Sequence, residues 1–273
     1  MTINCKGNLI DLSKPKVMGI LNLTPNSFYA ESRIAEEPVL LKKAEKMLKE
    51  GATFIDIGGY SSRPDADDVS KEEELNRVLP AIDLLIENFP EIIISVDTFR
   101  AEVAEKSIKA GAAIINDISA GSLDEEMMTI AAKHQVPYIM MHMRGTPKTM
   151  QSLTDYNDLT RDIIYYFSEK IKLAHQHGIN DIITDPGFGF AKTTSQNFEL
   201  FKNLELFKNL DQPFLVGISR KSMIYKSLGI NAQEALNGTT VLNSLALSKG
   251  ASILRVHDVK EAVECVKLYS QVC

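Results

Sequence analysis

Asp185 lies at the end of an apolar run in the segment 182–190, which reads Ile-Ile-Thr-Asp-Pro-Gly-Phe-Gly-Phe. The run has the pattern of a strand buried on both faces, and the proline and glycines end that strand. We therefore expect Asp185 at the carboxyl end of a parallel strand, where ligands bind in proteins of alternating strands and helices. The glycines let the backbone approach a flat ligand, which Phe188 and Phe190 could wall. Asp185 could instead cap the following helix.

A polar residue ends or follows each of eight apolar runs in the chain. These residues are Asn22, Ser62 or Arg63, Asp97, Asn116, His142, Asp185, Lys221, and Arg255 or His257. In a barrel of parallel strands, the carboxyl ends of the strands meet at one mouth. Any one of these residues could cap a helix or form a turn. Since none of the eight positions is apolar, we expect them to line one site.

A first group within this set has the chemistry of a site for a flat heterocycle. It offers two carboxylates, an amide and one cation, on Asp97, Asp185, Asn116 and Lys221. An amino-pyrimidinone edge needs a carboxylate for its N–H pair and an amide for its ring nitrogen and carbonyl. The faces of such a ring could pack on Ile118, Met141 and Phe190. The alternative is a structural ion pair between aspartate and lysine at the rim of the barrel.

A second group has the chemistry of a phosphate or diphosphate site. It contains two guanidinium groups, an imidazole, hydroxyls and an amide, on Arg63, Arg255, His257, Ser61, Ser222 and Asn22. Guanidinium groups bind phosphate oxygens in pairs. Asn22 offers a hard oxygen for Mg²⁺, which takes one or two protein ligands beside phosphate oxygens and water. A lone asparagine is more often a turn residue.

Eight alternations of strand and helix predict an α/β fold of the (β/α)₈ TIM-barrel type, in one domain spanning residues 1–273. The expected strands are 16–22, 53–57, 92–97, 113–117, 137–141, 182–185, 214–218 and 252–258. The expected helices are about 38–50, 71–88, 100–110, 123–133, 158–176, 234–249 and 259–270. The segment 9–12 could form a hairpin that covers the barrel floor. An open doubly wound sheet is the rival, but the glycine-rich fingerprint typical of that fold is missing.

The composition is that of an ordinary globular protein. The chain has 273 residues, of which 44% are hydrophobic and 24% charged. A net charge of −6 gives no electrostatic case for nucleic acid as a partner. No stretch approaches roughly 18 apolar residues, so we expect no membrane span. An odd number of cysteines, three, and no apolar segment typical of a signal peptide predict a cytoplasmic location.

Eight motifs, in order along nearly the whole chain, resemble those of the dihydropteroate synthase family. They are Gly-Ile-Leu-Asn-Leu-Thr-Pro at 19–25, Ser-Ser-Arg-Pro at 61–64, Ser-Val-Asp-Thr at 95–98, Asn-Asp at 116–117, Met-His-Met-Arg-Gly at 141–145, Asp-Pro-Gly-Phe-Gly-Phe at 185–190, Ser-Arg-Lys-Ser at 219–222 and Arg-Val-His-Asp at 255–258. The resemblance implies an enzyme of folate biosynthesis and a sulfonamide target. It would join 6-hydroxymethyl-7,8-dihydropterin diphosphate to p-aminobenzoate and release diphosphate, with Mg²⁺ as cofactor. It also implies a homodimer and a dissociative mechanism, in which diphosphate leaves before the amine attacks.

The resemblance also implies a role for each candidate residue. The pterin would be bound by Asp97, Asn116, Ile118, Met141, Asp185, Phe190, Gly217 and Lys221, among which Asp97, Asn116, Asp185 and Lys221 would be catalytic. Diphosphate would be bound by Asn22, Ser61, Arg63, Arg255 and His257, with Asn22 as the metal ligand. p-Aminobenzoate would be bound by Ser62, Arg63, Pro64, Lys221 and Ser222.

The first loop departs from the family pattern and leaves two alternatives open. The family usually has aspartate where this chain has Asn26 and Ala30, and glycine is common where it has Asp65. One alternative is a barrel that binds pterin with weak or no synthase turnover because of this loop. The other is a methyltransferase domain that binds methyl-tetrahydrofolate. That domain would share the carboxylate and amide group but would not need a basic group around a diphosphate, so the basic residues favour the synthase.

Overall fold

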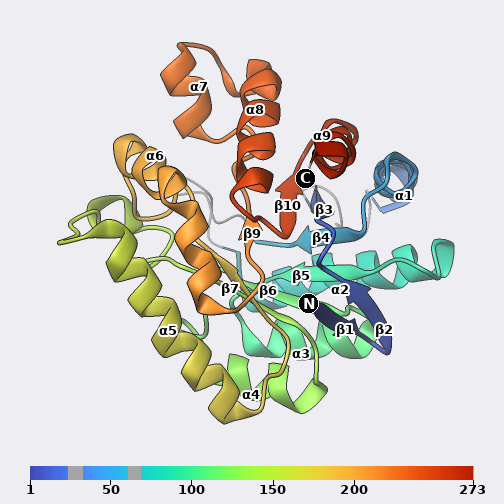
Figure 1. Ribbon diagram of the computed structural model, residues 1–273. Coiled ribbons are helices and arrows are strands. Elements are labelled where there is room, and N and C mark those ends of the chain that lie inside the picture. Colours follow the sequence, from blue (N-terminus) through green and yellow to red (C-terminus); the bar gives the residue numbers. More distant parts are fainter. Residues whose placement is uncertain (24–32, 61–68, 273) are drawn as a thin grey trace.

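The computed structural model describes residues 1–23, 33–60 and 69–272, and for residues 33–36 the backbone only. Its centre is a parallel sheet of eight strands in the order β8-β7-β6-β5-β4-β3-β10-β9 (Figure 1). The strands are β3 (Lys16–Asn22), β4 (Phe54–Gly58), β5 (Ile94–Asp97), β6 (Ile114–Asp117), β7 (Tyr138–Met141), β8 (Ile182–Asp185), β9 (Leu215–Val216) and β10 (Ile253–Val256). A parallel bridge between Thr184 and Phe214 joins the two edges of the sheet. The predicted (β/α)₈ barrel is therefore confirmed.

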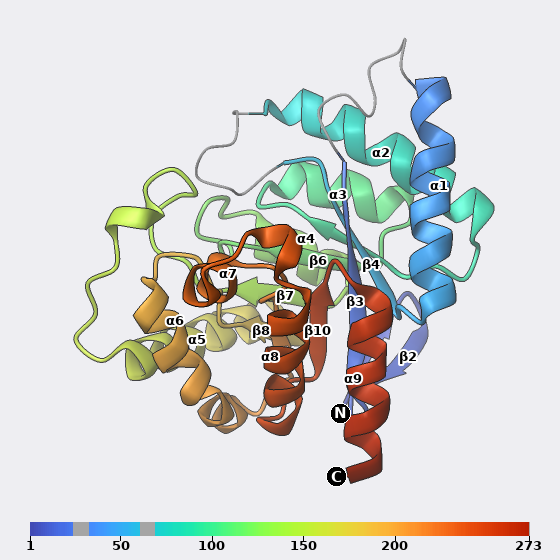
Figure 2. The same cartoon turned by 90° about the horizontal axis from the view of Figure 1, so that it is seen from above.

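The helices lie around the outside of the barrel (Figures 1 and 2). They are α1 (Arg33–Glu50), α2 (Lys71–Asn88), α3 (Ala101–Ala110), α4 (Met127–His134), α5 (Leu159–His177), α6 (Thr194–Lys202), α7 (Ser222–Leu228), α8 (Leu236–Ser248) and α9 (Val259–Val272). Short 3₁₀ helices occupy Met150–Ser152, Leu204–Leu210 and Ala232–Glu234. Within the described ranges, no helix is both long enough and apolar enough to cross a membrane.

Two features of the helices differ from the sequence-based expectation. α1 begins at Arg33, so Pro38, which was expected to start the helix, lies inside it. α6 and α7 have no counterpart among the expected ranges. α6 is short, and it begins with a capping box in which the Thr193 and Gln196 side chains satisfy each other's backbone N–H groups. That capping signal is present in the sequence, although the apolar stripe behind it is brief.

An amino-terminal hairpin covers the floor of the barrel, as expected, and it begins earlier than the segment 9–12. Its strands β1 (Thr2–Cys5) and β2 (Asn8–Asp11) pair antiparallel. The Ile3 and Cys5 side chains are each 1% exposed. They pack against apolar side chains at the amino ends of the barrel strands, namely Met18, Phe54, Ile114, Ile139, Ile183, Leu215 and Ile253. The hairpin thus closes the barrel at the end opposite to the polar mouth.

Truncation of Ile3 tests the contribution of this floor. Ile3→Ala is expected to lower the free energy of unfolding by about 2–5 kcal/mol, because it leaves a cavity among buried side chains. Leu9→Ala is the matched control, since Leu9 on the same hairpin is 73% exposed. The control is expected to stay within about 0.5 kcal/mol of the wild type in urea unfolding. Equal, small effects of both substitutions would show that the hairpin is not part of the core.

The register of the parallel strands places four of the expected site residues at the same height along the barrel axis. Asp97 on β5 pairs with Asn116 on β6, and Met141 on β7 pairs with Asp185 on β8. Each of these residues lies at or within one position of the carboxyl end of its strand. Because neighbouring strands are parallel, their carboxyl ends lie at the same end of the barrel. These four residues therefore lie together at the mouth of the barrel.

Candidate active site

Arg255 on β10 joins two carboxylates across the mouth of the barrel. Its Nε donates a hydrogen bond to Asp56 Oδ2 at 2.6 Å, and its Nη2 donates to Asp97 Oδ2 at 2.7 Å. The Asp56 side chain is 0% exposed and also accepts a hydrogen bond from Asn116 Nδ2 at 3.1 Å. The network connects β10, β4, β5 and β6, so it fixes Asp97 and Asn116 relative to each other.

This network connects the two groups of residues into which the sequence pattern divided the mouth. Arg255 was expected with the diphosphate group, but it forms an ion pair with Asp97 of the heterocycle group. Asp56, which connects them, was not identified from the sequence. The sequence feature that could have identified Asp56 is a carboxylate inside the apolar segment 54–57, since a charge in a buried strand requires a partner.

Asp185 ends β8 with a buried carboxylate. Its Oδ1 accepts a hydrogen bond from the backbone N–H of Gly187 at 2.8 Å, and the residue is 6% exposed. Burial raises the pKa of Asp185, while the nearby Lys221 ammonium works against that rise. Gly217 lies close by, because a Cβ placed on it would be 3.9 Å from Asp185 Oδ2. A ligand that donates hydrogen bonds to this carboxylate would favour its charged form.

Lys221 is held by the loop that follows β8. Its Nζ donates a hydrogen bond to the carbonyl of Phe188 and lies 4.9 Å from the centre of the Phe190 ring. Burial lowers the pKa of Lys221 to about 8, and the charge of Asp185 opposes this effect. Among the described residues, no carboxylate lies within ion-pair distance, 4.0 Å, of the Lys221 ammonium. The loop carbonyl replaces a carboxylate as its partner.

The apolar candidates lie together beside these polar groups. Ile118 and Met141 belong to a small buried cluster with Met143, Met150 and Ala191, and Phe190 packs against it. The cluster is separate from the main core between sheet and helices. It provides an apolar surface next to Asp185 and Lys221.

The remaining candidates differ in how much the structure says about them. Asn22 ends β3 with an exposed side chain. The His257 ring lies with Nδ1 3.1 Å from Ser219 Oγ, and Ser222 is the first residue of α7. Several predicted residues lie outside the described ranges, namely Ser61, Ser62, Arg63, Pro64, Asn26, Ala30 and Asp65.

Lys192 is a second functional candidate that sequence reasoning missed. It is 6% exposed, and its Nζ donates hydrogen bonds to the carbonyls of Gly187 and Phe190. Its third partner is Nδ1 of His142 at 3.0 Å. In the sequence, Lys192 stands in a polar stretch before α6, where a lysine is normally solvent-exposed.

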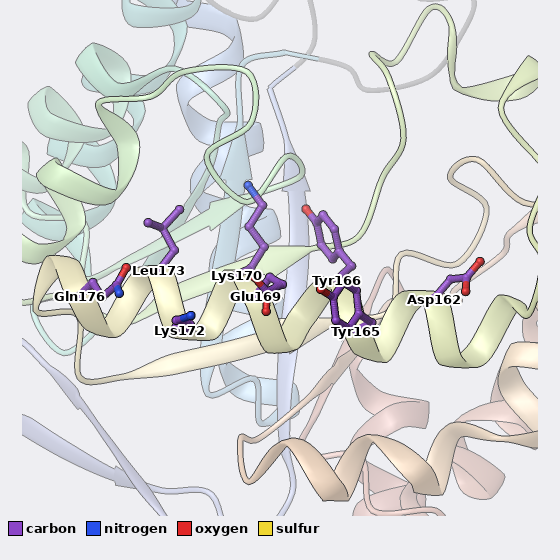
Figure 3. A pocket seen from close by; sticks show the side chains of 8 residues that line it. All are labelled: Asp162, Tyr165, Tyr166, Glu169, Lys170, Lys172, Leu173 and Gln176. Atoms are coloured by element: carbon purple, nitrogen blue, oxygen red, sulfur yellow. The ribbon is translucent and has the colours of Figure 1, made fainter.

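A surface hollow among the described residues lies away from these side chains. It has a volume of about 540 Å³ and is lined by side chains of α5, among them Tyr165, Tyr166, Lys170 and Leu173 (Figure 3). One helix face provides the whole lining, and no carboxylate or base from another element converges on it. We therefore place the site at the barrel mouth.

The fold and the polar mouth define a pterin-binding enzyme, and the family model described as "Pterin binding enzyme" matches residues 18–257. The chain is 44% identical over 271 residues to a dihydropteroate synthase of Escherichia coli, covering 98% of this chain and 95% of that protein. It is 45% identical over 255 residues to one of Synechocystis, covering 92% and 88%. The chain belongs to the dihydropteroate synthase family of transferases in folate biosynthesis.

Solved structures agree with this assignment. Yersinia pestis dihydropteroate synthase, in a complex with a sulfonamide drug, superposes with a TM-score of 0.90 at 42% identity, covering 100% of this chain and 98% of that one. The Thermus thermophilus enzyme in complex with 4-aminobenzoate gives a TM-score of 0.89 at 32% identity, covering 100% of both chains. The synthase prediction is confirmed, and the two alternatives are not favoured.

Proposed function

We propose that the barrel mouth binds 6-hydroxymethyl-7,8-dihydropterin diphosphate and p-aminobenzoate and joins them to 7,8-dihydropteroate, with release of diphosphate. The observation that carries the proposal is the convergence of buried Asp185 with the network of Asp56, Asp97, Asn116 and Arg255. Relatives have been solved with 4-aminobenzoate and in the presence of pteroic acid, which supports both substrate classes.

The buried groups would bind the pterin and stabilise the charge that it develops. The carboxylate of Asp185 would accept from the N–H groups of the amino-pyrimidinone edge, and Asn116 would bind the ring nitrogen or carbonyl. As diphosphate leaves, positive charge develops on the pterin, and the carboxylates of Asp185 and Asp97 would stabilise it. The amine of p-aminobenzoate then attacks the pterin methylene carbon and loses a proton. A protein nucleophile is not needed.

Arg255 can serve both ligands because a guanidinium has more donors than the network uses. It has five N–H groups, and two of its nitrogens are engaged by Asp56 and Asp97. Its free donors and His257 would bind the leaving diphosphate. In this arrangement, the charge of Arg255 is shared between the pterin side and the diphosphate side of the mouth.

Asn22 fits a magnesium site that is completed by substrate. Among the described residues, no group of three or more histidine, cysteine, aspartate or glutamate side chains could hold a metal ion. Mg²⁺ takes one or two protein oxygens when phosphate oxygens and water supply the rest, and Asn22 offers one exposed amide. When bound, the ion would stabilise the negative charge of the leaving diphosphate.

Substrate affinity should depend on pH through Lys221. Its ammonium is charged below a pKa of about 8 and neutral above it. If the charge binds a pterin carbonyl or the p-aminobenzoate carboxylate, affinity is expected to fall as the pH rises through that value. Calorimetric titrations on both sides of this pKa measure the effect, with Lys221→Met as the variant that should lose this pH dependence. The same alkaline decline in wild type and variant would show that Lys221 is not its source.

The homodimer and the cytoplasmic location stay predictions from the sequence. The α8 helix presents the apolar side chains of Val241 and Leu245 to the surface, 51% and 47% exposed. An apolar outer face on a barrel helix is suited to contact with a second copy of the chain. Sedimentation equilibrium of the purified protein measures the assembly state.

The proposed reaction is tested by formation of 7,8-dihydropteroate from the two substrates, followed by chromatography. We expect product with Mg²⁺ and a strong loss of product when a chelator is in excess. Product that is indifferent to the chelator would contradict the role of magnesium. A protein that binds both substrates without forming product would contradict the reaction.

A further inference from the structure

We propose that Lys192, with His142 as its hydrogen-bond acceptor, is a positioning residue that fixes the loop 187–190 and thereby the place of Lys221. The inference rests on the proposed function, because it concerns how the pterin and p-aminobenzoate side of the mouth is built. His142 is one of the eight residues expected at the mouth, but neither His142 nor Lys192 was assigned a contact with substrate.

The ammonium of Lys192 has an acceptor for each of its three protons. Its Nζ lies 2.9 Å from the Gly187 carbonyl oxygen, 3.0 Å from that of Phe190 and 3.0 Å from His142 Nδ1. A protonated lysine carries three donors and no acceptor, so Nδ1 of His142 accepts in its unprotonated form when Lys192 is charged. Burial and the nearby charge of Lys192 both lower the pKa of His142, which keeps the ring neutral.

The loop 187–190 lies between two lysines. The carbonyls of Gly187 and Phe190 bind Lys192, whereas the carbonyl of Phe188 binds Lys221. Gly187 has φ +69° and Gly189 has φ +84°, a left-handed backbone in which alternate carbonyls can face opposite sides. Lys192 is on the buried side and Lys221 on the mouth side. If the hydrogen bonds of Lys192 to this loop were lost, the loop would move. The Phe188 carbonyl and the Phe190 ring, both partners of Lys221, would move with it.

His142 is itself fixed from the outer layer of the barrel. The ring of Tyr166 on α5 packs edge-on against it, with 4.9 Å between ring centres. The Tyr166 hydroxyl lies 3.4 Å from the carbonyl oxygen of Met141, the residue before His142. Figure 3 shows Tyr166 rising from α5 toward the neighbouring segments of the barrel. A continuous chain of contacts therefore runs from α5 through His142 and Lys192 to the loop and Lys221.

A purely structural anchor would not need a charge at this place. Among the described residues no carboxylate lies within ion-pair distance, 4.0 Å, of the Lys192 ammonium, and desolvation of an unpaired cation is costly. Burial lowers the pKa of Lys192 well below its usual range, and the charge of Asp185 opposes that effect. In its protonated form, Lys192 acts on the site through its charge. Asp185 is faced by the cations of Lys221, Arg255 and Lys192 and by the Gly187 N–H, and all four lower its pKa against the effect of burial. A protonated Lys192 thus favours the ionised Asp185 that the proposed pterin site requires.

Three variants separate the positional role from the charge. Lys192→Met keeps an unbranched chain but removes the donors and the charge. His142→Leu removes one acceptor and keeps the charge, and His142→Asn keeps an acceptor near the position of Nδ1. Lys170→Met is the matched control, because Lys170 also donates to a loop carbonyl, that of Ala120 at 2.8 Å, on a different loop. Thermal melting shows whether each variant is folded.

Steady-state kinetics and inhibition by inorganic diphosphate measure the outcome. Lys192→Met is expected to lower kcat/KM for both substrates by about 100-fold, the effect of misplacing binding groups by roughly 1 Å. Inhibition by inorganic diphosphate should change by less than about threefold, because Arg255 and His257 are not held by this loop. The acidic limb of the pH profile should move to higher pH, since Asp185 loses a neighbouring cation. His142→Leu should lose activity without moving that limb, and His142→Asn should recover most of it.

Each result decides the proposal. Wild-type kcat/KM and pH profile in Lys192→Met would overturn it, as would an equal loss of diphosphate inhibition, which indicates general damage to the mouth. If Lys192→Met does not fold, wild-type activity of His142→Leu would overturn the positional role. A wild-type protein that forms no product contradicts the proposed function itself. A productive wild type with unaffected variants contradicts only the role of Lys192.

Discussion

Replacement of Asp185 with asparagine is expected to weaken the binding of pterin diphosphate by roughly 100-fold or more. The substitution removes the negative charge that would face the N–H groups of the pterin, and each hydrogen bond to a charged group contributes about 1.5–3 kcal/mol. The asparagine oxygen can still accept from the Gly187 N–H, so the loop and the fold should survive. Calorimetry measures the affinity, and thermal melting confirms folding.

Asp181→Asn is the matched control for this experiment. Asp181 accepts a hydrogen bond from the backbone N–H of Asn4 at 2.8 Å, in the hairpin at the opposite end of the barrel. The control should keep wild-type affinity for pterin diphosphate. An Asp185→Asn variant that binds as tightly as Asp181→Asn would remove Asp185 from the pterin site.

Replacement of Arg255 with methionine is expected to lower both stability and affinity. It leaves the carboxylates of Asp56 and Asp97 without their cation, and breaking a buried pair from one side costs about 3–5 kcal/mol of unfolding free energy. Because Arg255 contacts Asp97 directly, the affinity for a pterin without diphosphate should fall together with that for inorganic diphosphate. Urea unfolding and calorimetry measure these losses.

The double variant Arg255→Met with Asp56→Asn separates the two causes. It removes one of the stranded charges, so part of the stability should return, while diphosphate affinity should remain low. No recovery of stability would show that the unpaired Asp56 carboxylate is not the cause of the lost stability. A loss of affinity confined to inorganic diphosphate would show that two independent groups of residues at the mouth bind the pterin and the diphosphate.

The barrel was predictable because each strand is recognisable from neighbouring residues and the strand pattern recurs along the chain. Runs such as 182–185 are apolar and β-branched, and each ends in a polar residue, so strand positions follow from neighbours in the sequence. Helix boundaries were harder. Pro38 lies inside α1 although proline usually starts a helix, and α6 and α7 are too short to give a clear apolar stripe.

The types of residues at the site were predictable, but their pairing was not. Parallel strands bring polar ends together, which identified Asp97, Asn116 and Asp185. The ion pair of Arg255 with Asp56 spans 199 positions in the sequence and depends on which strands face each other across the barrel. Lys192 was missed for a similar reason, since only the fold brings two loop carbonyls and the ring of His142 to its Nζ.

The most direct test of the central claim is the release of diphosphate from pterin diphosphate, with Mg²⁺, in the presence and absence of p-aminobenzoate. Dihydropteroate is measured in the same samples. From the proposed reaction we expect diphosphate release that depends on p-aminobenzoate, with one dihydropteroate formed for each diphosphate released. Diphosphate release that is equally fast with and without p-aminobenzoate, and that yields no dihydropteroate, would contradict the claim that this mouth joins the two substrates.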